Sequence, residues 1–361
     1  MTSLLRVECA VFIWQPITHN PSICKFENLR RESKEKLMTL TMRWIRCCWM
    51  ATFLLSPSFA WHVTRKTDGS SSSRRFASLS SSEDFVHFKD SVTIVDDGPH
   101  HLVVAKPPSV VCHHNECGSR AQLEVPMLQR VRDAVNRKVN LVHRLDRGAS
   151  GCLLLTYMDD GNSTTVLSEA MSRANKTYVA LVRGEGILYG EDLRTKGWFA
   201  VDRPIKNAKG QIKNATTYFR FVAGQGNDSG NTDRARASLV LARPVTGRWH
   251  QVRKHLNGLS HPILGDSTHG ISQVNREWQK KRGLPVERTC LHLLKLSLPP
   301  TKYAPDGIQA ECALADDMME LLRTQLPDVL RDAEPILREE GLTLQPKSAV
   351  KTIPIEFSIP Q

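Results

Sequence analysis

The chain has 361 residues, of which 40% are hydrophobic and 24% charged, a composition that is normal for a globular protein. Its nine cysteines lie in a chain too long to need disulfide staples, which excludes a small disulfide-stabilised scaffold. Residues 83–300 carry 31 Lys or Arg against 21 Asp or Glu, and residues 301–361 carry 6 against 11; the basic middle suits a polyanion such as nucleic acid, with a soluble protein of high pI as the alternative.

Residues 1–82 have the pattern of a targeting leader. Two arginines precede an apolar stretch at Cys47–Leu55, and the small residues Ser58 and Ala60 follow where a signal-peptide cleavage site needs them. The apolar stretch is about half of the ~20 residues that span a bilayer. We therefore expect no stable membrane insertion.

The segment that follows, residues 65–82, is rich in Ser and Arg and has a single acidic residue, Asp68, which is typical of an organelle transit peptide. A signal peptide followed by a transit peptide resembles the two-part plastid leader of algae with secondary plastids, in which an aromatic residue such as Trp61 follows the cut. We expect a plastid location. A disordered front end and a mitochondrial or cytoplasmic location are the alternatives, and Met38 and Met42 are alternative translation starts.

From residue 83 onward the chain alternates between short strand-like and helix-like segments. Apolar runs bounded by turn residues predict strands, and apolar residues at helical spacing predict amphipathic helices. The polar residues 224–235 predict a long hairpin loop. The expected strands are Val92–Val95, Leu102–Ala105, Gly151–Thr156, Thr177–Val182, Thr216–Val222, Ser238–Ala242 and Leu291–Leu298, and the expected helices are Val125–Val139, Thr164–Ala174, His250–Leu259 and Ala313–Leu326.

These elements predict the fold class. Many strands with helices between them, without strict alternation, favour an α+β domain with a mixed, mostly antiparallel sheet flanked by helices. We expect this domain to span residues 83–326 as a monomer. Residues 327–361 have no firm pattern and are expected to form a C-terminal tail.

No metal or cofactor site is expected. The segment Cys112–Cys117 (CHHNEC) is the one cluster of possible zinc ligands, but a zinc site needs a second ligand pair at a suitable spacing downstream, and the sequence has none. The sequence also has no GxGxxG or Walker motif, so we expect no nucleotide cofactor.

The first segment that suggests chemistry is Leu141–Gly151 (LVHRLDRGASG). Asp146 lies between Arg144 and Arg147, and two glycines lead into a predicted buried strand. A carboxylate beside arginines stays ionised and can act as a nucleophile or an electrostatic stabiliser, and loops held by a rigid strand often carry chemistry. A surface ion pair explains this segment equally well.

The second segment is Lys176–Gly184 (KTYVALVRG). Tyr178 shares one face of the predicted strand with Ala180 and Val182 because side chains alternate along a strand. The tyrosine ring could stack on a base and its hydroxyl could move a proton. A core tyrosine is the simpler alternative.

The third segment is Thr246–His255 (TGRWHQVRKH), which continues to His261–Asp266 (HPILGD). Arg253 lies one residue past Val252, at the border of the apolar helix face. A border arginine can reach inward, and since a buried charge is costly without a partner, it implies a buried carboxylate. The alternative is a solvated basic face that binds phosphate without catalysis.

Together the three segments resemble the RluA family of pseudouridine synthases, which share an HRLD…SG segment, a KxYxALVxG segment and a GRxHQxRxH…HPIxGD segment. All three occur here in that order, and the resemblance covers about residues 90–325. The stretch His261–Trp278 is similar to the tRNA pseudouridine synthase C branch, in which GDSxHG and a downstream Asn-Arg replace the GDxLYG ending of the large-subunit rRNA enzymes. That similarity is carried by Asp266, His269, Gly270, Asn275 and Arg276.

The resemblance implies the pseudouridine synthase catalytic fold with a central RNA-binding cleft. It implies Asp146 as the catalytic aspartate, Tyr178 as the active-site tyrosine and Arg253 as the arginine that pairs with the aspartate. Ala149 stands where the family usually has Thr, and Trp249 is an unusual residue inside the GRxHQ run. The residues that we expect to bind RNA are Arg144, Arg147, Lys176, Arg248, His250, Gln251 and His255.

We therefore expect an isomerase that converts a uridine, most simply one in tRNA, to pseudouridine with Asp146 as nucleophile. The target uridine has to leave its stack to reach a catalytic pocket. One alternative is a pseudouridine synthase of the same family that acts on organellar large-subunit rRNA. The other is a non-catalytic RNA-binding protein that retains the fold, against which the intact set of Asp146, Tyr178 and Arg253 argues.

Overall fold

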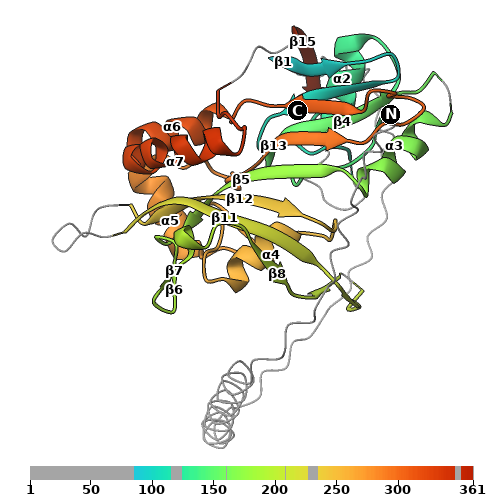
Figure 1. Cartoon of the computed structure of the whole chain (residues 1–361). Helices are drawn as coiled ribbons and strands as arrows, with labels where there is room; N and C mark the ends of the chain where they lie inside the picture. The colour runs from blue at the N-terminus through green and yellow to red at the C-terminus, as the bar shows by residue number, and fades with distance from the viewer. Residues whose placement is uncertain are drawn as a thin grey trace, which may run out of the picture. The chain divides into compact units, whose positions relative to one another are not determined.

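The computed structural model describes residues 85–114, 124–159, 161–207, 209–226, 235–345 and 351–360. They form an 11-stranded sheet in the order β15-β1-β2-β4-β13-β5-β12-β11-β8, with β14 paired to β13 and β3 to β4 (Figure 1). Among the strand pairs of these residues, β4 and β13 are parallel and the rest are antiparallel. The predicted α+β domain with a mixed, mostly antiparallel sheet is confirmed.

Strands and helices follow each other along the described chain without a regular alternation. The strands of the large sheet are β1 (Phe85–Asp97), β2 (His101–Lys106), β3 (Val139–Leu141), β4 (Ser150–Tyr157), β5 (Asn175–Arg183), β8 (Phe199–Asp202), β11 (Thr216–Gln225), β12 (Ala237–Pro244), β13 (Leu291–Leu298), β14 (Ile308–Glu311) and β15 (Lys351–Pro360). Two hairpins, β6 (Ile187–Leu188) with β7 (Glu191–Asp192) and β9 (Ile205–Lys206) with β10 (Ile212–Lys213), lie outside it. The helices are α2 (Met127–Val135), α3 (Ser163–Met171), the 3-10 helix η2 (Leu193–Lys196), α4 (Gln251–Gly258), α5 (Ser272–Arg282), α6 (Asp316–Gln325) and α7 (Pro327–Glu339).

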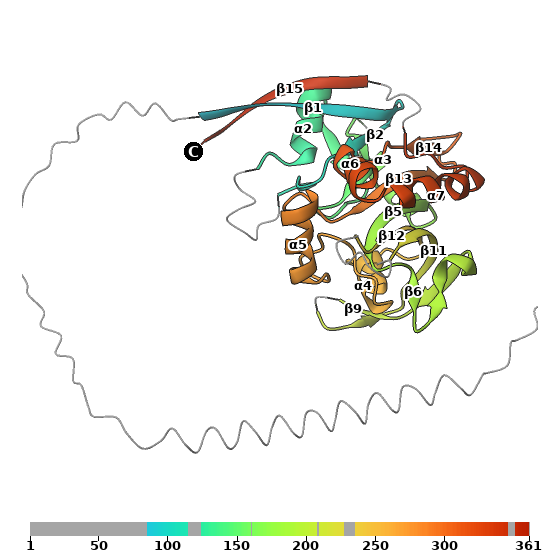
Figure 2. The ribbon, with the colours of Figure 1, turned by 90° about the vertical axis from the view of Figure 1, so that its left-hand side faces the viewer.

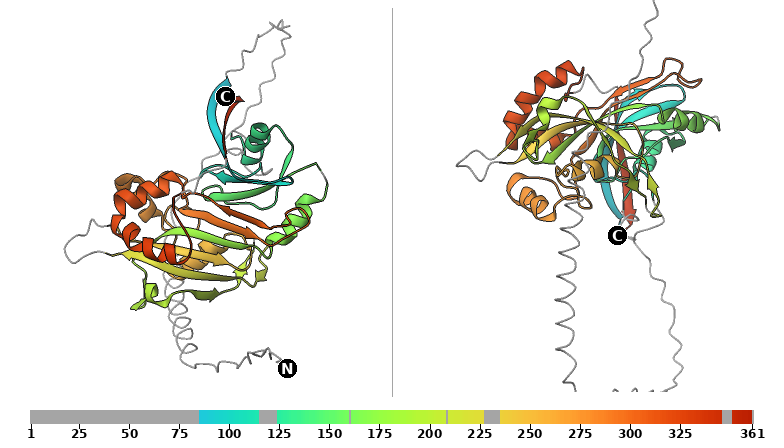
Figure 3. Two further views of the ribbon diagram at one scale, coloured as in Figure 1. Left: turned by 45° about the horizontal axis from the view of Figure 1, so that its top comes forward. Right: turned by 60° about the horizontal axis from the view of Figure 1, so that its bottom comes forward.

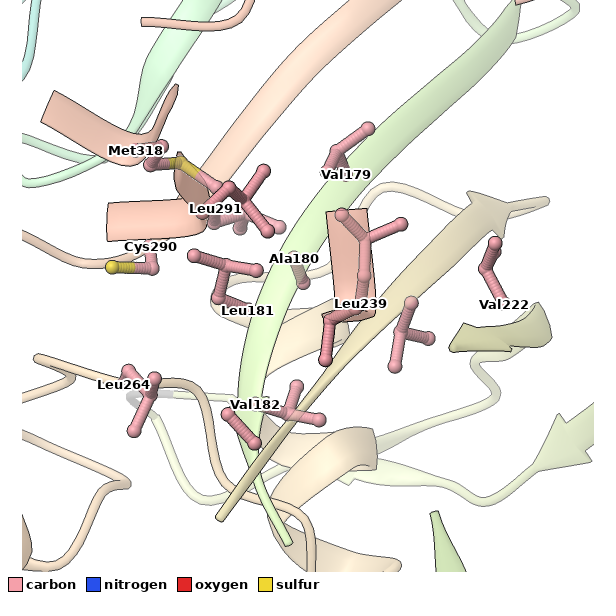
Figure 4. Packing of buried hydrophobic residues seen from close by; sticks show 14 of the residues in the cluster. Val179, Ala180, Leu181, Val182, Val222, Leu239, Leu264, Cys290, Leu291 and Met318 are labelled. Atoms are coloured by element: carbon pink, nitrogen blue, oxygen red, sulfur yellow. The ribbon is translucent and has the colours of Figure 1, made fainter. Parts of the chain in front are cut away.

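Two apolar clusters pack around the sheet and meet near its centre. One joins β1, β2 and β4 to α2 and α3, and the other joins β5, β11 and β12 to α4, α6 and α7. Figure 4 shows the second cluster, with Val179–Val182 of β5 packed among Leu239, Leu264 and Leu291. Tyr178 packs against both clusters. It therefore lies at the junction between the two halves of the core.

The first predicted helix is shorter than expected. It ends at Val135 because Asn136 adopts the left-handed conformation, with φ 50°. The residues that follow pair with β4 as strand β3. Helix α5 was not predicted at all, since it buries only Asn275 and Trp278 and so has no apolar stripe to recognise.

The expectation that residues 327–361 form a tail is wrong. Helix α7 buries Val329, Ala333 and Leu337, and its packing beside α6 is visible in Figures 1 and 3. Strand β15 pairs with β1 along ten positions, and Figure 2 shows the two strands running together. Prolines made both elements hard to predict, since Pro335 lies inside α7 and β15 also contains prolines. The prolines of β15 are tolerated because it is the edge strand. The predicted leader, residues 1–82, lies outside the described residues.

Glu340, at the end of α7, fixes the C-terminal helix to the sheet. One of its carboxylate oxygens accepts hydrogen bonds from Trp198 Nε1 (2.6 Å) and from Arg220, and the other accepts one from Arg243 (2.9 Å). The Arg243 guanidinium also lies over the Trp198 ring, 4.2 Å from its centroid. The carboxylate is thus held by three donors from β11, β12 and the segment before β8.

We expect the substitution Glu340→Gln to lower the free energy of unfolding by about 2 kcal/mol, because it removes charge-assisted hydrogen bonds at a side chain that is only 11% exposed. Burial acts to raise the pKa of Glu340, but the bonds from Trp198 and Arg220 and the charge of Arg243 hold it below its usual 4.5. The stabilisation should be complete above pH 4.5 and disappear as the pH falls through the lowered value. Urea unfolding of both proteins at several pH values measures this; an equal difference at all pH values would contradict it.

Candidate functional site

Two cavities meet at the carboxylate of Asp146. One has a volume of about 780 Å³ and is lined by Tyr178, Lys176 and the loop before α4. The other, of about 600 Å³, is lined by α5 and the loop that precedes it. Both volumes lie in the range of small-ligand pockets. The residues that line both cavities are Arg144, Leu145, Asp146, Trp249, His250 and Arg253.

The sheet register brings Asp146 and Tyr178 to the same place. Asp146 lies in the loop just before β4, and Tyr178 lies on β5. Leu293 of β13 is the register partner of both Gly151 and Tyr178, so β4 and β5 flank the same point of β13. Gly151 has φ 115°, and an added Cβ would lie 2.3 Å from Leu293 O. Glycine is required there to let the strands pair.

Two buried cationic side chains, Lys106 and Arg288, bind the loop that carries Asp146. Lys106, which is 1% exposed, donates hydrogen bonds to the carbonyls of Pro107 (2.8 Å), Arg147 (3.1 Å) and Ala149 (2.7 Å). Arg288 donates to Gly148 O (2.8 Å) and to Ser150 Oγ (2.8 Å). Burial lowers the pKa of Lys106 to about 8. Its ammonium is therefore still charged at neutral pH and can donate hydrogen bonds to these carbonyls.

His143 ties the same loop to β4. Its Nε2 accepts a hydrogen bond from the backbone N–H of Leu154 (3.1 Å), and Val142 N donates to Leu154 O (3.1 Å). Burial lowers the pKa of His143 to about 4. The imidazole is therefore neutral and acts as a structural acceptor that extends the strand pairing towards Asp146.

Arg253, from α4, makes the predicted contact with Asp146. Its NH1 donates to Asp146 Oδ2 at 2.7 Å, while Nε and NH2 bind both oxygens of Asp266 at 2.7 and 2.6 Å. Asp266, which is 1% exposed, also accepts the backbone N–H groups of Thr268 and His269 at 2.9 and 2.8 Å. Asp266 thus fixes the guanidinium, and the guanidinium fixes Asp146. Arg253 thus contacts Asp146, whose side chain is part-exposed, and its fully buried carboxylate partner is Asp266, which the sequence analysis did not foresee.

Electrostatics keep Arg253 and Asp266 ionised. Burial acts to lower the pKa of Arg253, but the hydrogen bonds and charges of Asp266 and Asp146 raise it above its usual value. Burial acts to raise the pKa of Asp266, which its bonds from Arg253 and from two backbone N–H groups lower instead. Burial and the negative charge of Asp146 raise the pKa of Tyr178, so the tyrosine hydroxyl stays protonated.

A group of aromatic rings lies beside Asp146. His250 Nε2 lies 3.7 Å from Asp146 Oδ2, and His250 Nδ1 shares a hydrogen bond of 2.9 Å with His269 Nε2. The Trp249 ring stacks on the His250 ring at a centroid distance of 3.9 Å and is 52% exposed. A carboxylate, a guanidinium, a neutral phenol and an imidazole thus line the larger cavity together. This set suits nucleophilic or acid–base chemistry on a ring-shaped ligand.

The structure divides the seven residues that were expected to bind RNA. Arg144, Lys176, Arg248 and His250 line the cavities. Arg147 does so too, but its guanidinium is paired with Glu124 (3.0 Å) and Glu287 (2.8 Å). Its charge is therefore largely matched by neighbouring carboxylates.

His255 is too deeply buried to reach RNA, whereas Gln251 lines the larger cavity. His255 is buried, with its ring nitrogens bonded to Thr217 Oγ1 (3.0 Å) and Arg203 O (3.0 Å). The Gln251 amide bonds the backbone and side chains of β11 and of the loop before α4. Both face inward because the helix turns them towards β11. Gln251 shapes the loop that carries Trp249 and His250.

Four residues of the site were missed as functional: Lys106, Asp266, His269 and Arg288. Asp266 and His269 lie in the stretch similar to the tRNA branch, so that similarity was the available signal. A lysine at a strand end before Pro107, and an arginine in an unpatterned loop, have no such signal. Their role depends on which carbonyls the fold places within reach.

The described residues include the first half of the CHHNEC segment, residues 112–114. Within the described residues, no group of three or more His, Cys, Asp or Glu side chains is arranged around a common centre. The Cys112 thiol contacts the backbone N–H and carbonyl of Leu145 at 3.4 Å each, and residues 115–117 lie outside the described ranges. Separately, none of the described helices has both the length and the apolar character to cross a bilayer.

Comparison with known proteins gives a consistent family. The family model described as RNA pseudouridylate synthase matches residues 100–258. The chain is 32% identical over 209 residues to tRNA pseudouridine synthase C of Yersinia pestis, covering 57% of this chain and 80% of that protein. It is 31% identical over 246 residues to tRNA pseudouridine synthase C of Salmonella typhi, covering 63% and 89%.

Solved structures are also similar. Human RNA Pseudouridylate Synthase Domain Containing 1 matches with a TM-score of 0.48 and 20% identity, over 71% of this chain and 97% of that one. Human RNA Pseudouridylate Synthase Domain Containing 4 matches with a TM-score of 0.47 and 20% identity, over 65% and 93%.

Proposed function

Because the chain belongs to the RNA pseudouridylate synthase family, of the RluA type, and is therefore an isomerase, we propose that it converts a specific uridine of a tRNA to pseudouridine. Asp146 is the nucleophile of the proposed reaction, and no cofactor takes part. The observation that carries the proposal is the 2.7 Å contact of Arg253 with Asp146 at the junction of two cavities.

The proposed reaction moves the uracil ring from one bond to another. The N1–C1′ glycosidic bond breaks, the ring turns over, and C5 bonds to C1′ and loses its proton while N1 gains one. No oxidation occurs, so the steps need no redox group. The Asp146 carboxylate attacks the ribose or the ring, or takes a proton from the ribose, and its hydrogen bond from Arg253 orients it.

The larger cavity suits the target base. The uridine leaves its stack to reach this cavity, where the ring of Tyr178 packs against the uracil. Arg144, Lys176 and Arg248 line this cavity and supply positive charge for flanking phosphates. The basic body of the chain supports a nucleic-acid partner on the same electrostatic grounds.

We propose a tRNA as the substrate because the similar proteins of Yersinia pestis and Salmonella typhi are tRNA pseudouridine synthases. The test uses the full chain and transcripts of tRNA or of organellar large-subunit rRNA with tritium at uridine C5. We expect tritium release from tRNA. Release from the rRNA alone would favour the rRNA alternative, and binding of both RNAs without release would favour a non-catalytic RNA-binding protein.

We also propose that residues 1–82 direct the chain to a plastid, on the support of their signal-like and transit-like segments. Fusion of this leader to a fluorescent protein, expressed in an alga with a secondary plastid, should place the fluorescence in the plastid. Fluorescence in mitochondria or throughout the cytoplasm would contradict the proposal.

A further inference from the structure

We propose that His250 and His269 form a proton relay that carries the C5 proton of the target uracil from the catalytic cavity to solvent. The proposal rests on the proposed function and assigns one of its steps. The reaction has to remove this proton after the new C–C bond forms. Tyr178 is a poor acceptor, because burial and the charge of Asp146 favour its protonated form.

The two imidazoles are arranged in series. His250 Nε2 is the nitrogen that faces Asp146 Oδ2, at 3.7 Å, and His250 Nδ1 is the one bonded to His269 Nε2, at 2.9 Å. The His250 side chain lines both cavities and is nearly buried, whereas His269 is only half-buried. One end of the pair therefore touches the reaction site, and the other lies nearer to water.

His250 is held in an unusual backbone conformation that sets this direction. It lies in the left-handed region, with φ 55° and ψ 29°, as the residue that begins α4. A non-glycine residue is uncommon there, and such strain occurs most often at functional sites. The stacked ring of Trp249 and the edge of His269, whose centroid is 5.1 Å away, hold the imidazole on two sides.

The surroundings keep His250 neutral and so able to accept. The groups that face it are the carboxylates of Asp146 and Asp266, the guanidinium of Arg253 and the ring of His269. Burial, together with the charges of Arg253 and His269, outweighs the two carboxylates and lowers its pKa to about 4. Burial also lowers the pKa of His269. Both rings are therefore neutral at pH 7; when His250 Nδ1 donates to His269 Nε2, the lone pair of His250 Nε2 is left to accept a proton.

The transfer balances in protons and charge. The C5–H bond breaks, its electron pair returns to the uracil ring, and the proton goes to His250 Nε2. His250 passes its Nδ1 proton to His269 Nε2, and His269 releases its own Nδ1 proton to water. N1, freed from the ribose, takes a proton from water, so the product is neutral and no co-reactant is consumed.

The test compares wild-type enzyme with His269→Gln, whose amide oxygen can still accept a hydrogen bond from His250 but cannot pass a proton on. Tritium release from C5-labelled tRNA should slow about 100-fold, as expected for a lost acid–base group. The deuterium isotope effect at C5 should increase, since proton removal becomes rate-limiting. For His250→Gly, added imidazole should restore part of the lost rate.

A matched control is His100→Gln, whose ring packs on Tyr303 away from the site; its rate and isotope effect should equal those of wild type. A His269→Gln enzyme with wild-type rate and isotope effect would overturn the relay. So would a slow enzyme with an unchanged isotope effect and no response of His250→Gly to imidazole, which would indicate a purely structural role. If wild-type enzyme released no tritium from any RNA, the proposed function itself would fail, a result distinct from either of these.

Discussion

Substitution of Asp146 by Asn is expected to abolish pseudouridine formation, with a loss of at least ~10⁴-fold in rate, because removal of a nucleophile eliminates the step on which the rest depends. The fold should survive. The side chain is 27% exposed, Asn has the same shape, and Arg253 keeps its two bonds to Asp266. The free energy of unfolding should therefore change by less than about 1 kcal/mol.

The measurement is tritium release under single-turnover conditions, with urea unfolding of the same preparation. Rates close to wild type would remove Asp146 from the mechanism. An unfolded variant would contradict the claim that its role is chemical.

Substitution of Arg253 by Met is expected to damage both stability and catalysis. It leaves the carboxylate of Asp266, which is 1% exposed, without its cationic partner, and breaking a buried ion pair from one side costs about 3–5 kcal/mol. Asp146 loses its 2.7 Å contact at the same time. We expect the rate to fall by about 10³-fold, comparable to the loss of other positioned charged groups in enzymes.

The double variant Arg253→Met, Asp266→Asn separates the two effects. Removing the stranded charge should restore much of the lost stability, since the penalty comes from the unpaired carboxylate. It should not restore the rate, because nothing then orients Asp146. A double variant as unstable as the single one, or as active as wild type, would show that Asp266 does not act through Arg253.

The parts of the site that could be predicted are those that lie in short, recognisable sequence segments. The segments around Asp146, Tyr178 and Arg253 each left a simpler alternative open, and only their joint resemblance to the RluA family identified these residues as site candidates. The strands and amphipathic helices around them follow from apolar periodicity. Helix α5 has only two buried residues and lacks that periodicity. Helix α7 and strand β15 have apolar residues at the expected spacing but contain prolines, so they were not recognised.

The sequence by itself determined the α+β class, because apolar periodicity is a local property, and it singled out Asp146, Tyr178 and Arg253 as candidates through the resemblance of three segments to one family. Only the tertiary structure decided which side chains support them. The pairs Arg253–Asp146 and Arg288–Gly148 are 107 and 140 residues apart in the chain, so their contact depends on how β4, β13 and β5 pair rather than on any motif. The packing of α4 on β11 likewise turned His255 inward, since the direction of a side chain depends on what packs against its helix.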